Sequence, residues 1–187
     1  MEKFSKIKPR DEFKEKDDKI LYENDYVKLI EFEDWAIMKE KDFVVCIAYL
    51  IETNQFILRH EYVPSYKYAD NDDYYLTILS GGIEQGESPD DAIKRELEEE
   101  AGIVINDDFI LEPPEVFFIS KSSCNKYYIY IIELNENDYH EVIPKGDGSE
   151  IEKKSKSVKL DVKYINSLKP SDIITSYMLL KLKENLF

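Results

Sequence analysis

Three glutamates near the middle of the chain are spaced to hold a divalent metal ion. Glu99 and Glu100 follow Glu96 by three and four residues, which in an α-helix puts the three carboxylates on one face. Without a partner these groups repel one another, and Glu99 and Glu100 would lie in the last helical turn, where the helix dipole favours cations. A bound cation would remove both costs. Because the ligands are oxygen atoms only, we expect Mg²⁺, with Mn²⁺ as an alternative.

The surrounding residues predict a glycine-rich loop followed by a helix over residues 89–101. Ser88 is suited to cap this helix, Pro89 to be its first residue and Gly102 to end it. Residues at every fourth position form the face expected to be buried: Ile93, Leu97 and Ala101. Three glycines allow a tight loop close to the helix: Gly81, Gly82 and Gly86. A metal ion held here could bind substrate phosphates and help water to attack phosphorus.

Acidic runs are also common on solvated helices, so the segment ELEEE alone leaves a purely structural role open. The wider spacing is more specific. Gly81 is followed after five residues by Glu87, and seven residues later comes the cluster Arg95-Glu96-Leu97, any residue, Glu99-Glu100, any residue, Gly102-Ile103. This pattern closely resembles the Nudix box and fits it at every specified position.

The resemblance implies both a fold and a metal site. Nudix proteins have an α/β fold, an α/β/α sandwich around a mixed sheet, and most hydrolyse a nucleoside diphosphate linked to another group. By this resemblance the metal ligands and catalytic residues are Glu96, Glu99 and Glu100, and Glu84 is a further contributor to the metal site.

The resemblance also assigns roles outside the metal site. An acid in a late loop can act as general base, and Glu150 or Glu152 occupies the comparable region. Substrate binding is expected from Arg59 and from the backbone at Gly81 and Gly82. Glu87 and Arg95 would brace the loop against the helix through a charge-assisted contact.

Within the family the chain looks most like the ADP-ribose and nucleoside-diphosphate-sugar pyrophosphatases. Those proteins are usually homodimers with a small N-terminal sheet. We therefore expect residues 1–42 to be an arm and small antiparallel sheet that could serve dimerisation, and residues 43–187 to be the Nudix domain. The implied reaction is Mg²⁺-dependent hydrolysis of ADP-ribose, or a related sugar compound, to a nucleoside monophosphate and a sugar phosphate.

Departures from that branch leave other substrates open. Leu79 and Ser80 stand where Pro-Ala is common, Phe118 stands at the offset of a marker proline, and SKSSCNK replaces a Pro-Gly and Glu pattern. The alternatives are dinucleoside polyphosphates, NADH, nucleoside triphosphates and capped RNA ends. A non-catalytic nucleotide sensor is a rival of another class, and the intact set of three glutamates argues against it.

Hydrophobic periodicity predicts the remaining elements. After a flexible arm over 1–19, strands at 20–25, 26–33 and 35–40 form the small sheet. A strand buried on both faces at 43–51 forms a hairpin with 56–62, and a polar loop containing 70–73 leads to a strand that ends at Ser80. Further strands are expected at 115–120, 126–134 and 157–162, and Ser171 is expected to cap a C-terminal helix.

The amino-acid composition limits the kinds of molecule that the protein is expected to bind. A net charge of −15 argues against general nucleic-acid binding, so we expect a small nucleotide substrate. No apolar run suited to a membrane span and no signal peptide are visible, and a cytoplasmic location is expected.

Cys46 should be buried, and neither it nor Cys124 has zinc-site or disulfide spacing. No catalytic role is assigned to His60 or His140, and three tyrosines near Arg59 are expected to pack rather than stack on a base: Tyr62, Tyr66 and Tyr68.

Overall fold

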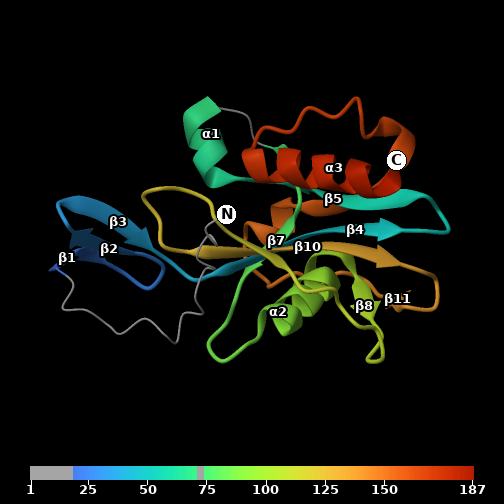
Figure 1. Ribbon diagram of the computed structural model, residues 1–187, viewed down its shortest axis with the longest axis horizontal. Helices are drawn as coiled ribbons and strands as arrows, with labels where there is room; N and C mark the ends of the chain where they lie inside the picture. Colours follow the sequence, from blue (N-terminus) through green and yellow to red (C-terminus); the bar gives the residue numbers. More distant parts are fainter. Residues whose placement is uncertain (1–18, 71–73) are drawn as a thin grey trace, which may run out of the picture.

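A mixed sheet with helices on both sides forms the centre of the molecule. The computed structural model describes residues 19–70 and 74–187, and Figure 1 shows α1 and α3 on one side of this sheet and α2 on the other. β4 and β10 pair in parallel, while the other neighbouring strands are antiparallel. The α/β sandwich predicted from the sequence is therefore confirmed. The strands of the sheet are β4 (Phe43–Leu50), β5 (Gln55–Glu61), β6 (Tyr75–Thr77), β7 (Leu79–Gly82), β9 (Glu115–Phe118), β10 (Lys126–Leu134) and β12 (Lys156–Asp161).

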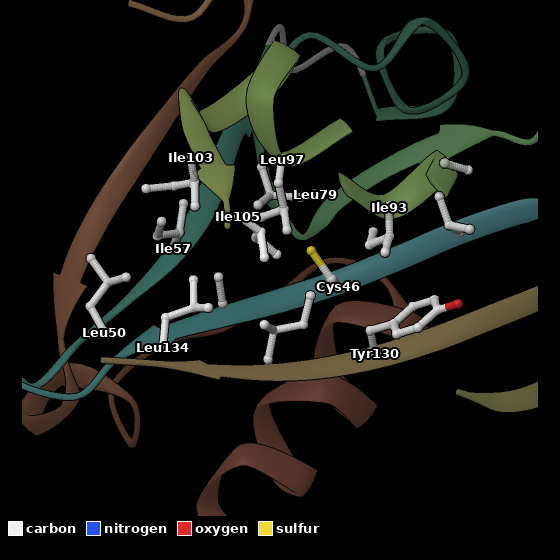
Figure 2. Packing of buried hydrophobic residues seen from close by; sticks show 14 residues of the cluster. Cys46, Leu50, Ile57, Leu79, Ile93, Leu97, Ile103, Ile105, Tyr130 and Leu134 are labelled. Atoms are coloured by element: carbon white, nitrogen blue, oxygen red, sulfur yellow. The ribbon is translucent and has the colours of Figure 1, made fainter. Parts of the chain in front are cut away.

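Strand β4 is buried on both faces because its side chains alternate between two cores. The even-numbered side chains pack against α2 and its surroundings, in the core drawn in Figure 2: Val44, Cys46, Ala48 and Leu50. The odd-numbered ones pack toward α3 (Ile173–Leu186): Val45, Ile47 and Tyr49. Cys46 is fully buried as predicted, and desolvation, together with the nearby charge of Glu100, raises the pKa of its thiol.

Helix α2 (Pro89–Glu96) begins where the sequence predicts. The Ser88 hydroxyl accepts a hydrogen bond of 3.1 Å from the backbone amide of Asp91, which satisfies an otherwise unpaired group of the first turn. The helix continues as a π-helical turn over Leu97–Ala101, and Gly102 ends it with a left-handed φ of 66°. The predicted limits are thus confirmed, but the last turn, which carries Glu99 and Glu100, is wider than a regular α-helix.

The predicted N-terminal sheet consists of β1 (Lys19–Glu23), β2 (Lys28–Phe32) and β3 (Trp35–Lys39), paired antiparallel. Backbone hydrogen bonds connect this small sheet to the segment SKSSCNK, residues 120–126, which leads into β10 of the main sheet. The Met38 amide donates to the Ser122 carbonyl at 2.7 Å, and the Cys124 amide donates to the Met38 carbonyl at 3.2 Å. The segment that departs from the pyrophosphatase pattern therefore holds β3 in place. The arm expected over 1–19 lies, except for Lys19, outside the described residues.

Several local predictions were incomplete or wrong. The expected loop before residue 74 begins with a helix, α1 (Pro64–Asp70), and the loop predicted over 71–73 lies outside the described residues. A two-stranded sheet of β8 (Ile103–Ile105) and β11 (Tyr139–Glu141) was not predicted. Asp172, rather than Ser171, caps α3, because its carboxylate accepts from the Thr175 amide at 2.7 Å. Short 3₁₀ turns lie at Glu152–Lys154 and Val162–Tyr164. Within 19–70 and 74–187, no helix combines the length and apolar character needed to cross a bilayer.

Candidate metal and active site

A pocket of about 230 Å³ gathers the carboxylates of the box. Strand β7, the end of α2 and the loop 144–148 contribute to it. We call it the carboxylate pocket, and its lining residues are Lys41, Ser80, Gly81, Gly82, Glu84, Arg95, Glu96, Glu99, Glu100 and Asp147. The fold thus brings together the four glutamates that the sequence assigned to a metal site.

Glu96 lies against the backbone of the glycine-rich loop. Its side chain is largely buried, with a residue exposure of 8%. A Cβ atom added at Gly81 would overlap the carboxylate of Glu96, whereas one added at Gly82 would lie 3.1 Å from the flexible Lys41 side chain and 4.0 Å from the Phe43 ring. The Glu96 carboxylate can therefore keep this position only next to a residue without a Cβ atom.

Glu100 is held in the interior by two donors. Arg59 Nη1 lies 3.2 Å from Glu100 Oε1, and the Ser80 amide donates to Glu100 Oε2 at 3.0 Å. Arg59 is itself only 1% exposed. The residue that the sequence assigned to substrate binding is thus a buried partner of a box glutamate, and charge pairing is what makes its burial tolerable.

Arg95 links the loop to the helix. Its Nε donates to Glu87 Oε1 at 2.9 Å, and its Nη2 donates to Glu87 Oε2 and to the Gly82 carbonyl, both at 3.1 Å. The hydrogen bonds from Arg95 lower the pKa of Glu87 below its ordinary value, and those from Glu87 raise the pKa of Arg95. This contact has the geometry expected of a brace.

Two of the box carboxylates already share one positive charge. Arg95 Nη1 lies 2.6 Å from Glu96 Oε1 and 3.0 Å from Glu99 Oε2, so one cation can contact both. Glu100 faces Arg59 instead, and within the described ranges no three acidic, histidine or cysteine side chains are grouped around one point as metal ligands. The donor set, carboxylate oxygens in a partly enclosed pocket, suits a hard divalent ion that would draw Glu100 into a common site.

Glu150, the first of the two predicted general bases, does not line the carboxylate pocket. The side chain of Glu150 is 81% exposed and pairs with Lys153 at 2.6 Å, and the side chain of Glu152 lies outside what the structure describes. Asp147, from the same loop, lines the pocket instead. Sequence reasoning missed it, although an acid between two glycines, Gly146 and Gly148, is a signal for a tight turn that presents its side chain.

The aromatic residues near Arg59 pack on one another. Tyr62 and Tyr66 make edge contacts with Tyr74 and Tyr75, and His60 stacks on Tyr74. Tyr68 is exposed. Packing, rather than base stacking, accounts for the contacts that these side chains make.

Comparison with known proteins identifies the family. The profile of the NUDIX domain matches residues 41–161. A solved structure titled "Crystal structure of ADP compounds hydrolase" has a similar fold, with a TM-score of 0.62 and 21% identity over 90% of this chain and 94% of that chain. None of the curated proteins matches.

An α/β sandwich with an intact box at the end of α2 defines a hydrolase of the Nudix class. The chain belongs to the Nudix family, as the box residues predict. Nudix hydrolases act on small nucleotide substrates and generally use divalent metal ions.

Proposed function

We propose that the protein is a Mg²⁺-dependent pyrophosphohydrolase that cleaves the diphosphate of ADP-ribose or a related nucleoside diphosphate sugar. The products would be a nucleoside monophosphate and a sugar phosphate. The gathering of Glu84, Glu96, Glu99 and Glu100 in one pocket supports this proposal most strongly. The fold shared with a protein named as an ADP compounds hydrolase, over most of both chains, favours this substrate class.

The proposed metal ligands are Glu96, Glu99 and Glu100, with Glu84 at the rim. Mg²⁺, or Mn²⁺, would neutralise the diphosphate oxygens and make the attacking water more acidic. Gly81 leaves room for the Glu96 carboxylate, and the Ser80 amide and Arg59 hold Glu100. Arg95 fixes the loop through Glu87 while its Nη1 group bridges Glu96 and Glu99. The chain thereby holds the carboxylates near one another before substrate binds, and the metal ion would draw Glu100 into the common site.

Asp147 is our candidate for the general base. In the proposed step its carboxylate takes a proton from water as the water oxygen bonds to one phosphorus, and the phosphoanhydride bond breaks toward the other phosphate. Its place in the carboxylate pocket favours it over Glu150, which is exposed and bound to Lys153. Glu150 remains the second candidate from the same loop.

We also propose that residues 1–42 serve dimerisation. The described part of this segment exposes large apolar side chains on its small sheet: Ile20, Leu21, Tyr22, Tyr26, Trp35 and Met38. Apolar groups in this density are typical of surfaces that a partner covers. Sedimentation of the wild type and Trp35→Glu tests this: a dimer that the substitution dissociates is expected, and a monomeric wild type would contradict it.

The function is tested with a panel of substrates. We would incubate the wild type or Glu99→Gln with Mg²⁺ and one compound at a time. The compounds are ADP-ribose, nucleoside diphosphate sugars, NADH, a nucleoside triphosphate, a dinucleoside polyphosphate and capped RNA. We expect release of a monophosphate and a sugar phosphate by the wild type only. Activity on triphosphates alone would refute the proposed substrate, and ligand binding without turnover, even with Mn²⁺, would favour a sensor.

A further inference from the structure

A second pocket, of about 370 Å³, shares Glu99 and Glu100 with the carboxylate pocket. We call it the basic pocket, because five cationic residues line it: Arg59, Lys145, Lys153, Lys156 and Lys159. Its described lining has no acid besides the two shared glutamates. The chain as a whole has 40 acidic and 25 basic residues, so the local charge is opposite to the overall charge.

The basic pocket is fixed to the end of the helix that carries the glutamates. On one wall the Gly146 amide donates to the Glu99 carbonyl at 2.9 Å. On the other wall, in β12, the Ser157 hydroxyl donates to the Glu100 carbonyl at 2.7 Å. When the diphosphate of a substrate is held at the carboxylates, the substrate group attached to that diphosphate would therefore extend into the basic pocket.

Two of the lysines are available for an anion. Lys153 pairs with Glu150 and Lys159 pairs with Glu141, each at 2.6 Å, and Arg59 pairs with Glu100. Lys145 and Lys156 are exposed at the surface and make no ion pair with any residue in 19–70 or 74–187. Two cations that form no ion pair and line the same cavity attract an anionic ligand.

The basic pocket is better suited to a phosphate than to a neutral sugar. The only uncharged polar side chains in its described lining are Ser155 and Ser157. Both hydroxyls already donate to carbonyl groups, of Ile151 at 3.1 Å and of Glu100 at 2.7 Å. Lysines can donate to sugar hydroxyls as well, but a phosphate gains more from them because its hydrogen bonds to the ammonium groups are charge-assisted.

We propose that the basic pocket binds a phosphoryl group of the substrate in addition to the two phosphates of the diphosphate that is cleaved. This inference rests on the proposed function and narrows it. A third phosphate carried as a monoester on the attached sugar keeps the substrate within the proposed class, whereas one that continues the phosphate chain would make it a polyphosphate, the alternative substrate named above. In both cases Lys145 and Lys156 contact the third phosphate. ADP-ribose without such a group is then the weaker substrate.

Binding of inorganic phosphate tests the pocket without any turnover. We would titrate phosphate, at low salt and without divalent metal, into the wild type, the double variant Lys145→Gln/Lys156→Gln, and Lys169→Gln. Lys169 is an exposed lysine that does not line the pocket, and it is the matched control. We expect saturable binding that weakens at least about fivefold in the double variant and is unchanged in the control. No saturable binding by the wild type, or equal affinity in the double variant, overturns the proposal.

Hydrolysis then distinguishes the two forms of the third phosphate. With Mg²⁺, kcat/KM is compared for ADP-ribose, for ADP-ribose phosphorylated on its terminal ribose, and for a dinucleoside tetraphosphate. In the wild type, kcat/KM should be higher for one of the two phosphate-bearing compounds than for ADP-ribose. The ratio of these two kcat/KM values should fall about tenfold in the double variant and not in the control. If the protein turns over substrate but the kcat/KM ratio is the same in the wild type and the double variant, this inference is overturned and the proposed function is left intact. Absence of all turnover refutes the proposed function, while the phosphate titration still decides the pocket.

Discussion

The Glu96 carboxylate occupies the space that a Cβ atom at Gly81 would need. Substitution Gly81→Ala must therefore displace Glu96 or separate β7 from α2. We expect kcat/KM to fall about 100-fold, as when one electrostatic group of an active site is removed. Mg²⁺ affinity, measured by titration calorimetry, should fall with it.

Gly82→Ala is the matched comparison because the one tight contact of its Cβ would be with the flexible side chain of Lys41. Its loss of activity should be several times smaller. Equal activity of Gly81→Ala and wild type would show that Glu96 does not need its present position.

The variants Glu99→Gln and Glu100→Gln should differ in stability, although both glutamates are proposed metal ligands. Glu100 and Arg59 form a buried pair with side-chain exposures of 5% and 2%, whereas the Glu99 side chain is 29% exposed. In Glu100→Gln the guanidinium keeps its charge in the interior, so the free energy of unfolding should fall by about 3 kcal/mol. For Glu99→Gln the expected loss is under about 1 kcal/mol. Urea unfolding without metal measures both, and equal stabilities would contradict the role of the Arg59 pair.

Glu87 should make the fold sensitive to acid. Its pKa is lowered in the folded state by Arg95, so its contribution is fully present above the unfolded pKa of about 4.3. That contribution is lost as the pH falls through the lower, folded pKa. Glu87→Gln should cost about 2 kcal/mol near pH 7 and flatten the decline in stability below about pH 4.5. Chemical unfolding from pH 3 to 7 provides the measurement.

Glu98→Gln is the control for that series, since Glu98 is an exposed glutamate of the box segment and is not among the ion-pair partners of Arg95. Its stability should follow the wild-type profile. A Glu87→Gln profile that also parallels the wild type would remove the Arg95 contact as the cause.

Features encoded within a short segment could be predicted from the sequence. The unbroken apolar run of β4 indicates burial on both faces, because side chains of a strand alternate and here both sets are apolar. Ser88, Pro89 and Gly102 define α2 through local backbone chemistry. The box spacing likewise located the glutamates that line the carboxylate pocket.

Features that depend on distant contacts could not be predicted. Arg59 and Glu100 meet only because β5 and the end of α2 pack together, and nothing near either residue indicates the partner. Strands β8 and β11 are three residues each, too short for a periodicity signal, and they exist through pairing with each other. That Asp147 rather than Glu150 lines the carboxylate pocket depends on how the loop between β11 and the turn Glu152–Lys154 folds back.

Asp147 and Glu150 are rival bases in one loop, and their amide variants decide between them. If Asp147 accepts the proton of the attacking water, Asp147→Asn should lower kcat about 100-fold with little change in KM, because general-base catalysis contributes to the chemical step. Glu150→Gln should lose far less, since its carboxylate is exposed and bound to Lys153. Steady-state kinetics with the best substrate of the panel measures both constants. A larger kcat loss in Glu150→Gln would transfer the role to Glu150 and require the loop to turn when substrate binds.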